Sequence, residues 1–365
     1  MSELPTYEPD FEEYIRQGEP DKKAKAELWQ TAIGLQQVDG LHVSDYLLET
    51  ARRNIEGEIS IDEVQKLIKA YYVSKDLRST DDENVAEADK VASNIRQILA
   101  TQTLDFSANG LISLHRRIFD GVFKHAGRIR DYNITKKEFV LRGNTVHYLN
   151  WEDLRRALDY DIDQEKQFSY SGLSQDEVIT HITQFVAGIW QIHAFGEGNT
   201  RTTAVFTIQY LRSIGFDVNN DMFARHSWYF RNALVRANYR NIALGVDYSP
   251  VYLERFFRNL LLGEQWELKS RYLVINPPKD YAEQPRRDKE NVTENITTQK
   301  TTQKTTQKKI IEYIKAHPMA TRNEIAMYVR ITADGVKYHL AIMQRQGILK
   351  RIGGRKLGHW EIIDN

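Results

Sequence analysis

The chain has 365 residues, with 50 Lys/Arg balanced by 50 Asp/Glu and no cysteine. This length suffices for two or three domains, and the absence of cysteine excludes disulfides and thiolate chemistry. Residues 308–365 carry eleven Lys/Arg and five Asp/Glu, a net charge of +6 that the remaining residues offset with −6. No apolar run reaches the ~18 residues of a membrane span, and residues 1–14 lack the basic start and apolar core of a signal peptide. We therefore expect a cytoplasmic protein with no membrane partner.

Residues 1–80 are predicted to form a small helical domain. Apolar residues recur at helical spacing over residues 23–38, and Asp39-Gly40 ends that helix. A second helix is predicted over residues 44–55. A third is predicted over residues 60–72, where Ser60 and Glu63 form a capping box.

A second domain is predicted over residues 81–276 and begins with helices at 81–99 and 107–123. The stretch FVLRGNTVHYLNW, residues 139–151, then alternates apolar and polar residues around Gly143-Asn144. This pattern is typical of a β-hairpin. Most other segments of the domain have helical periodicity, so we predict a mainly α fold.

Residues 191–206, QIHAFGEGNTRTTAVF, join two of the predicted helices. One helix opens at the capping box of Ser174 and Glu177 and ends near His193, and the next begins near Asn199. Gly196 and Gly198 allow the backbone to turn tightly and to approach a ligand closely. The free N–H groups that open the second helix favour an anion such as phosphate.

The side chains of this turn suit phosphate chemistry. Glu197 can hold Mg²⁺, which usually needs only one or two carboxylates. Asn199 and Arg201 can bind phosphate oxygens, and His193 can act as a base near neutral pH. A lone histidine at a helix end is more often structural, but the combination of these residues in this order favours a functional site.

The stretch resembles the signature of the Fic family, H-x-F-x-[DE]-G-N-[GK]-R-x-x-R, whose members mostly transfer AMP from ATP to a hydroxyl of a target protein. The resemblance implies a Fic-type helical bundle with a β-hairpin flap, with ATP as co-substrate and Mg²⁺ as cofactor. By position it implies that His193 is the general base, that Phe195 anchors the loop and that Glu197 holds Mg²⁺. It assigns nucleotide binding to five residues, with the last of them on the β-phosphate: Gly196, Gly198, Asn199, Thr200 and Arg201.

Two positions depart from the family pattern. Thr200 stands where glycine or lysine is usual, and threonine can cap a helix at this place. Ala204 stands where the second arginine is usual. In the family that arginine orients the γ-phosphate and pairs with an inhibitory glutamate, so both functions need another explanation here.

The N-terminal helices resemble the antitoxin module that partners or precedes many Fic domains. Its inhibitory motif, [ST]-x-x-x-E-[GN], matches Leu35, Asp39 and Gly40, so Asp39 is the predicted inhibitory residue. Aspartate is shorter than glutamate by one carbon, about 1.5 Å of bond. A rival is Glu56 in the sequence NIEG, with Arg52 at the place of the hydroxyl residue. With Ala204 opposite, the resemblance implies an inhibitory lock that is weakened or lost.

The predicted hairpin matches the family's flap, which holds the target peptide by β-strand addition. The resemblance therefore implies that Val146, His147 and Tyr148 dock the target near His193. The alternative is that the hairpin is only a connector.

The C-terminal part separates into a linker and a basic domain. Residues 277–307 contain prolines, charges and TTQK repeats, which cannot build a core. Residues 308–365 have a helix–helix–helix–hairpin pattern that resembles an α+β winged helix, whose third helix enters the major groove of DNA. The DNA-contact residues predicted on this helix and on the wing are Lys337, Tyr338, Arg345, Arg351, Arg355 and Lys356.

We predict a Fic-type protein adenylyltransferase whose target is a Ser, Thr or Tyr hydroxyl, on another protein or on itself. Two other interpretations remain open. One is a DNA-binding transcriptional regulator that uses a divergent Fic domain as a nucleotide sensor, and the other is transfer of a group other than AMP. The oligomeric state is left open by the sequence, with a homodimer among the options.

Overall fold

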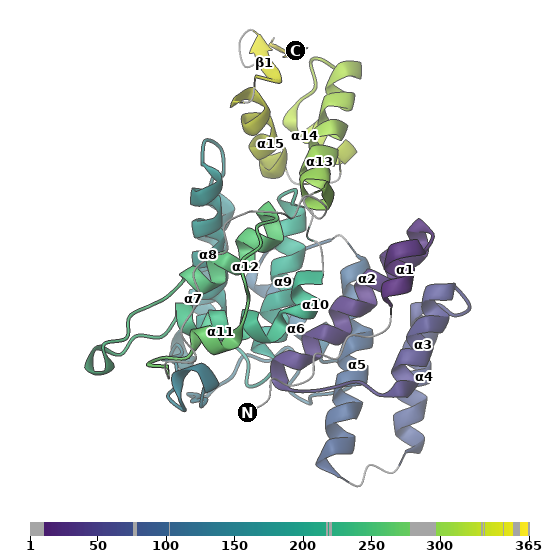
Figure 1. The fold of residues 1–365 in the computed structure, drawn as a ribbon, viewed down its shortest axis with the longest axis vertical. Coiled ribbons are helices and arrows are strands. Elements are labelled where there is room, and N and C mark those ends of the chain that lie inside the picture. Colours follow the sequence, from purple (N-terminus) through teal and green to yellow (C-terminus); the bar gives the residue numbers. More distant parts are fainter. Residues whose placement is uncertain are drawn as a thin grey trace.

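The computed structural model describes residues 11–75, 79–101, 103–216, 218, 221–277, 297–329, 331, 333–345, 347–352 and 358–363. The fold is mainly helical, as predicted, and its elements form a large body with a smaller C-terminal unit at one end (Figure 1). Within these residues, no helix combines the length and the apolar character that crossing a membrane requires.

The N-terminal helices form in the order predicted. Ser44 and Ser60 cap α3 and α4, and Ser60 makes the predicted capping box with Glu63. The first predicted helix is divided, because the chain tightens into a 3₁₀ helix after Gly34 and stops at Gly40, which has a left-handed φ of 71°. The elements are α1 (Glu12–Gln17), α2 (Pro20–Gly34), η1 (Leu35–Asp39), α3 (Asp45–Glu56) and α4 (Ile61–Ser74).

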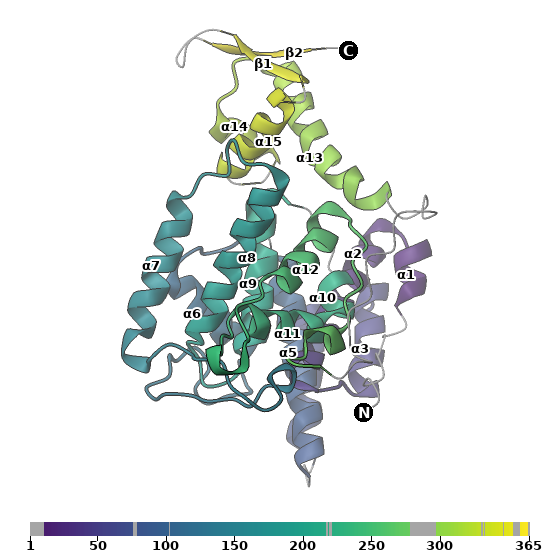
Figure 2. The same ribbon diagram turned by 60° about the vertical axis from the view of Figure 1, so that its left-hand side comes forward.

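The central bundle surrounds α8 and α9, which run side by side (Figure 2). α8 is apolar over most of its length, and α9 is buried from Asn199 to Leu211. The helices of the bundle are α5 (Thr80–Ala100), α6 (Ala108–Ile118), α7 (Leu154–Gln167), α8 (Gln175–Ile192), α9 (Asn199–Ser213), α10 (Asp221–Arg225), α11 (Ser227–Ala237) and α12 (Val251–Leu262). Short 3₁₀ helices lie between them: η2 (Phe139–Leu141), η3 (Trp151–Asp153), η4 (Ile242–Leu244) and η5 (Ser270–Leu273).

The N-terminal helices and the central bundle share one hydrophobic core, which includes Phe11, Trp29, Leu35 and Phe206. η1 contacts α5, α9 and α11, so the end of the N-terminal module is inserted against the helix that follows the glycine turn. This contact brings Asp39 to the functional site described below.

The predicted β-hairpin of residues 139–151 is wrong. The chain forms η2 there, with left-handed φ values of 52° at Arg142 and 88° at Gly143. Tertiary hydrogen bonds explain the difference: the Val140 carbonyl accepts from the Ile275 N–H at 2.8 Å, and Arg142 Nη1 donates to the Asn276 carbonyl at 3.0 Å. The first bond uses a backbone carbonyl that a hairpin ladder would have needed, and the second attaches the Arg142 side chain to the same distant segment.

The C-terminal unit has its own small core around Ile310, Ile325, Leu340 and Leu349. Its elements follow the predicted order: α13 (Thr297–Ala316), α14 (Arg322–Val329), α15 (Ala333–Arg345), and the antiparallel strands β1 (Leu349–Ile352) and β2 (His359–Ile362). α13 begins earlier than predicted and includes the TTQK repeats, which were expected to be part of a linker. Of the predicted DNA contacts, the side chains of Tyr338 and Arg345 and the wing residues Arg355 and Lys356 lie outside the described residues.

Candidate active site

His193 lies at the C-terminal end of α8, where it acts as the cap residue with left-handed φ and ψ of 51° and 54°. This conformation costs a non-glycine residue of the order of 1–3 kcal/mol, so the surroundings must hold it in place. The side chain is buried between the rings of Tyr148, at 4.0 Å between centroids, and Trp190, at 5.3 Å.

The protonation of His193 follows from its contacts. Nδ1 lies 3.3 Å from the Trp190 carbonyl, which can only accept, so this nitrogen carries the proton in the neutral ring. Nε2 is buried and has no hydrogen-bond partner among the described residues. Burial, followed by the positive charge of Lys136, holds the pKa of His193 well below its ordinary value. His193 is therefore a neutral imidazole whose buried Nε2 keeps a lone pair that is unpaired among the described residues.

The glycine turn between the two helices has no room for side chains. Gly198 has a φ of 73°, and a Cβ there would lie 2.2 Å from the Phe119 ring. A Cβ at Gly196 would lie 2.7 Å from the Tyr132 hydroxyl. The backbone N–H groups of Asn199, Thr200 and Arg201 have no partners among the described residues, so the start of α9 keeps free donors for an anion.

Asn199 and Thr200 support the turn through their side chains. The Asn199 side chain accepts from the Phe195 N–H at 3.0 Å and donates to the Phe195 carbonyl at 2.7 Å. The Thr200 hydroxyl accepts from the Trp190 indole N–H at 3.0 Å. The threonine therefore fastens α9 to α8, whereas the N-cap residue of α9 is Gly198. Any phosphate contact of these two residues would come from their backbone.

Glu197 is the carboxylate predicted to hold Mg²⁺. Its side chain is 59% exposed and forms an ion pair with Lys136 at 3.0 Å. Among the described residues, no three His, Asp or Glu side chains group closely enough to bind a metal on their own. A single exposed carboxylate fits a Mg²⁺ ion that is also held by nucleotide phosphates, once Lys136 has moved.

Arg201 is not directed to the glycine turn but is held by the N-terminal module. Its Nε lies 2.8 Å from Asp39 Oδ2, Nη1 donates to Gln36 Oε1 at 3.1 Å, and Nη2 lies 2.6 Å from Glu87 Oε1. The arginine side chain is only 3% exposed. Two carboxylates on one guanidinium leave this cluster with a net negative charge, which disfavours a phosphate nearby.

The inhibitory candidate Asp39 thus contacts Arg201, the first arginine of the motif. The family pattern had placed the partner of the inhibitory residue at the second arginine position, which is Ala204 here. Ala204 is buried in α9. The rival Glu56 pairs with Lys22 at 2.7 Å at the end of α3, so these two residues face each other within the N-terminal module.

Tyr148 lies next to His193, and the segment that holds the three predicted flap residues forms no hairpin. Val146 is buried, and Gln191 donates to the His147 carbonyl at 3.3 Å. Tyr148 covers the His193 ring and donates to Glu138 Oε1 at 3.2 Å. Glu138 is itself buried and pairs with Arg231 at 2.7 Å. The position of Tyr148 is therefore set from α11.

Arg130 is a part of the site that the sequence analysis missed. Its buried guanidinium donates to backbone carbonyls: His193 at 2.7 Å, Leu149 at 2.6 Å, Tyr132 at 2.5 Å and Ile192 at 3.5 Å. A cation at the last carbonyls of α8 also complements the helix dipole. One side chain thus holds both the strained backbone of His193 and the end of the flap segment. The only signal in the sequence was its place in GRIR, shortly before the expected hairpin.

Replacing Arg130 with lysine is expected to lower the turnover of the transfer reaction proposed below by about 10²-fold, because lysine cannot make this set of bonds and a shift of about 1 Å at a reacting group costs this much. The Michaelis constant for ATP should change little, because Arg130 does not contact the glycine turn. Arg128→Lys, an exposed change in the same segment, is the control. Equal turnover in both variants would contradict this role.

His115 holds the outer side of the glycine turn. Its Nδ1 accepts from the Gly127 N–H at 2.8 Å, so Nε2 carries the proton and donates to the Glu197 carbonyl at 3.1 Å. The ring stacks on Phe195 at 3.8 Å. Burial lowers the pKa of His115 from 6.5 to about 4.

This depressed pKa predicts acid sensitivity. Above pH 6.5 the His115 imidazole is neutral in the folded and in the unfolded protein. At lower pH the unfolded chain binds a proton there, whereas the folded protein binds it only near pH 4. The free energy of unfolding should therefore fall by about 2 kcal/mol between pH 7.5 and pH 5 through this one residue. Denaturant titrations at both pH values should show a smaller fall in His115→Gln than in the wild type. His42→Gln, an exposed control, should follow the wild type, and an unchanged fall in His115→Gln would refute the assignment.

These features define a class of site: a neutral, buried histidine beside a glycine turn and the free N-terminus of a buried helix. The family model described as Fic/DOC family matches residues 105–211, which include all of this site except Arg201's partners in the N-terminal module and α5. This segment is therefore a Fic/DOC family domain.

Two known proteins are similar to the chain. The protein adenylyltransferase VbhT of Bartonella schoenbuchensis is 23% identical over 184 residues, which cover 47% of this chain and 37% of that protein. A crystal structure of a Fic family protein from Desulfovibrio desulfuricans G20 aligns over 97% of this chain and 91% of that one, with 11% identity and a TM-score of 0.42. The chain thus matches little more than a third of the length of VbhT.

Proposed function

We propose that this protein is a Fic-type adenylyltransferase that transfers AMP from ATP to a Ser, Thr or Tyr hydroxyl of a protein, in the cytoplasm. The observation that carries the proposal is the buried His193, whose Nε2 lone pair is unpaired among the described residues, at the end of the helix that precedes the glycine turn and the free N–H groups of α9. The similarity to a protein adenylyltransferase supports the choice of reaction.

In this reaction His193 Nε2 takes the proton of the target hydroxyl. The hydroxyl oxygen attacks the α-phosphorus, and the bond from that phosphorus to the β-phosphate oxygen breaks, so that pyrophosphate leaves. The N–H groups that open α9 bind the phosphate oxygens and stabilise the charge that develops there. Mg²⁺ on Glu197 would neutralise the phosphates when bound.

We further propose that the structure represents an inhibited state. Arg201 is the side chain expected on the β-phosphate, but its donors are directed to Gln36, Asp39 and Glu87. It can reach a nucleotide only after this cluster opens. The sequence suggested that the inhibitory lock was weakened. In this proposal the lock is retained in another form, in which Asp39 pairs with Arg201, the first arginine of the motif.

Intact-mass spectrometry after incubation with ATP and Mg²⁺ tests the proposal. The chain with Asp39→Asn and Glu87→Gln should gain the mass of one or more AMP groups, on itself or on an added protein extract. A mass that stays unchanged with ATP but increases with another nucleotide or with a phosphocholine donor would assign a different transferred group and keep the class of reaction. No gain with any donor would reject the enzymatic function.

A second candidate is a DNA-binding regulator in which the Fic domain senses a nucleotide. It is favoured by the net charge of +6 over residues 308–365, where Lys337 and Arg351 are partly exposed on α15 and β1. Gel-shift titration of the full chain with genomic fragments at low salt tests it. Binding that weakens steeply with salt supports this candidate, and no shift rejects it.

A further inference from the structure

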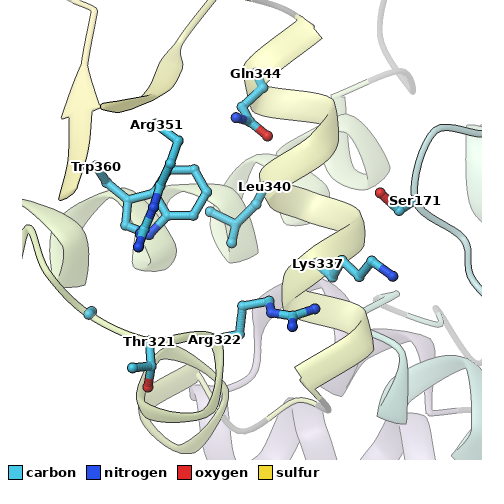
Figure 3. Close-up of a pocket in the computed structure, with 9 residues that line it drawn as sticks. Ser171, Thr321, Arg322, Lys337, Leu340, Gln344, Arg351 and Trp360 are labelled. Carbon is cyan, nitrogen blue, oxygen red and sulfur yellow. The ribbon is translucent and has the colours of Figure 1, made fainter. Parts of the chain in front are cut away.

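The C-terminal unit and the Fic domain border a pocket of about 630 Å³, a size typical of small-molecule sites. α14, α15, β1 and β2 form most of its wall, and Ser171 from the turn between α7 and α8 closes one end (Figure 3). Three cationic side chains from three different elements line it: Arg322, Lys337 and Arg351. Among the described residues, no carboxylate lines the pocket.

Arg351 lies on the core side of the two-stranded sheet. Strand alternation puts it on the same face as the buried Leu349, and its cross-strand partner on that face is Trp360. The guanidinium stacks on the Trp360 ring at 4.8 Å and makes no ion pair with any described residue. Arg351 is thus a charged side chain on the inner face of a sheet, without a neutralising partner among the described residues and beside two other cations. An anion that enters the pocket explains this arrangement.

The contacts between the Fic domain and α15 limit which ligands can enter the pocket. Lys337 Nζ donates to Ser169 Oγ at 2.8 Å, and the buried His339 donates from Nε2 to the Gly215 carbonyl at 3.0 Å. A Cβ at Gly335 would lie 2.7 Å from the Ile214 carbonyl oxygen, so the first half of α15 is in close contact with the end of α9. In this structure the contact covers the part of a reading helix that duplex DNA requires in a groove about 12 Å wide, so DNA could be read only after the C-terminal unit leaves the Fic domain.

We propose that this pocket binds a phosphate-bearing small molecule of nucleotide size between the C-terminal unit and the Fic domain. Arg322, Lys337 and Arg351 bind its phosphate oxygens. The Trp360–Arg351 pair offers a planar surface for a base or another flat group. The site is separate from the glycine turn, so the proposal does not depend on the adenylyltransferase function.

The experiment is hydrogen–deuterium exchange on the full chain with ATP, AMP, pyrophosphate and inorganic phosphate as probes. We expect protection of amides in α15, β1 and β2, with ATP or AMP binding more tightly than pyrophosphate. Titration should show that Arg351→Gln and Lys337→Gln each weaken this binding about tenfold or more, since each removes a charge-assisted hydrogen bond. Lys350→Gln, the neighbouring cation on the opposite face of β1, is the matched control, and thermal melts of all variants verify folding.

Three results would overturn the proposal. Protection confined to the glycine turn would place all nucleotide binding at the Fic site. Equal affinity of the Arg351→Gln, Lys337→Gln and Lys350→Gln chains would show that the pocket does not bind the probes. Binding of a duplex that depends on Arg351 and Lys337, without binding of any small probe, would assign the pocket to DNA.

Discussion

Replacing His193 with alanine is expected to lower AMP transfer by roughly 10²–10⁴-fold, which is the usual contribution of a positioned general base. The variant loses Nε2, a buried nitrogen that is unpaired among the described residues. ATP binding should be retained, because the N–H groups of α9 are unaffected. The measurement is intact mass over time, in a background that carries Asp39→Asn and Glu87→Gln.

The pH dependence of transfer gives a second readout for His193. Because its pKa is held well below 6.5, mainly by burial, the ring remains a neutral base at pH values where an ordinary histidine is protonated. The acid limb of the rate profile should therefore lie below pH 6.5. His42→Ala, an exposed histidine on the N-terminal module, should leave rate and profile unchanged. Full transfer activity in His193→Ala would exclude it as the base.

The second large effect is expected from opening the cluster on Arg201. The Asp39→Asn and Glu87→Gln pair keeps the shape of both side chains and removes both negative charges. This should release the guanidinium to phosphate and increase the rate of transfer by about 5- to 150-fold, the usual range of coupling between two sites. Rates of self-modification at equal ATP, compared with the wild type, measure the gain.

Two further variants make this test specific. Adding Arg201→Met to the open pair should abolish the gain, because the gain depends on a freed arginine. Glu56→Gln, at the rival inhibitory position, should behave as the wild type, since Glu56 pairs with Lys22. A gain from Glu56→Gln, or none from the open pair in a chain with measurable basal transfer, would contradict the lock at Asp39.

Local sequence signals were sufficient to predict where helices begin, because one residue type at the N-cap decides the start. Serine caps and capping boxes begin α3, α4 and α8 where predicted. α7 was not predicted, because its buried residues Leu154, Leu158 and Ile162 stand among charged neighbours that conceal the periodicity. The failed hairpin had the right alternation, but the Val140 carbonyl and the Arg142 side chain bond to residues 275 and 276, far along the chain.

The sequence by itself determined the helical class from the periodicity of its segments, and the place of His193 and the glycine turn from the residues of one short stretch. Only the tertiary structure decided what the buried polar side chains contact. Arg130 holds the backbone of His193, and Arg201 faces Gln36, Asp39 and Glu87 from distant segments. The physical reason is that a buried guanidinium must find several acceptors, and packing of whole helices, not local spacing, determines which acceptors come within reach.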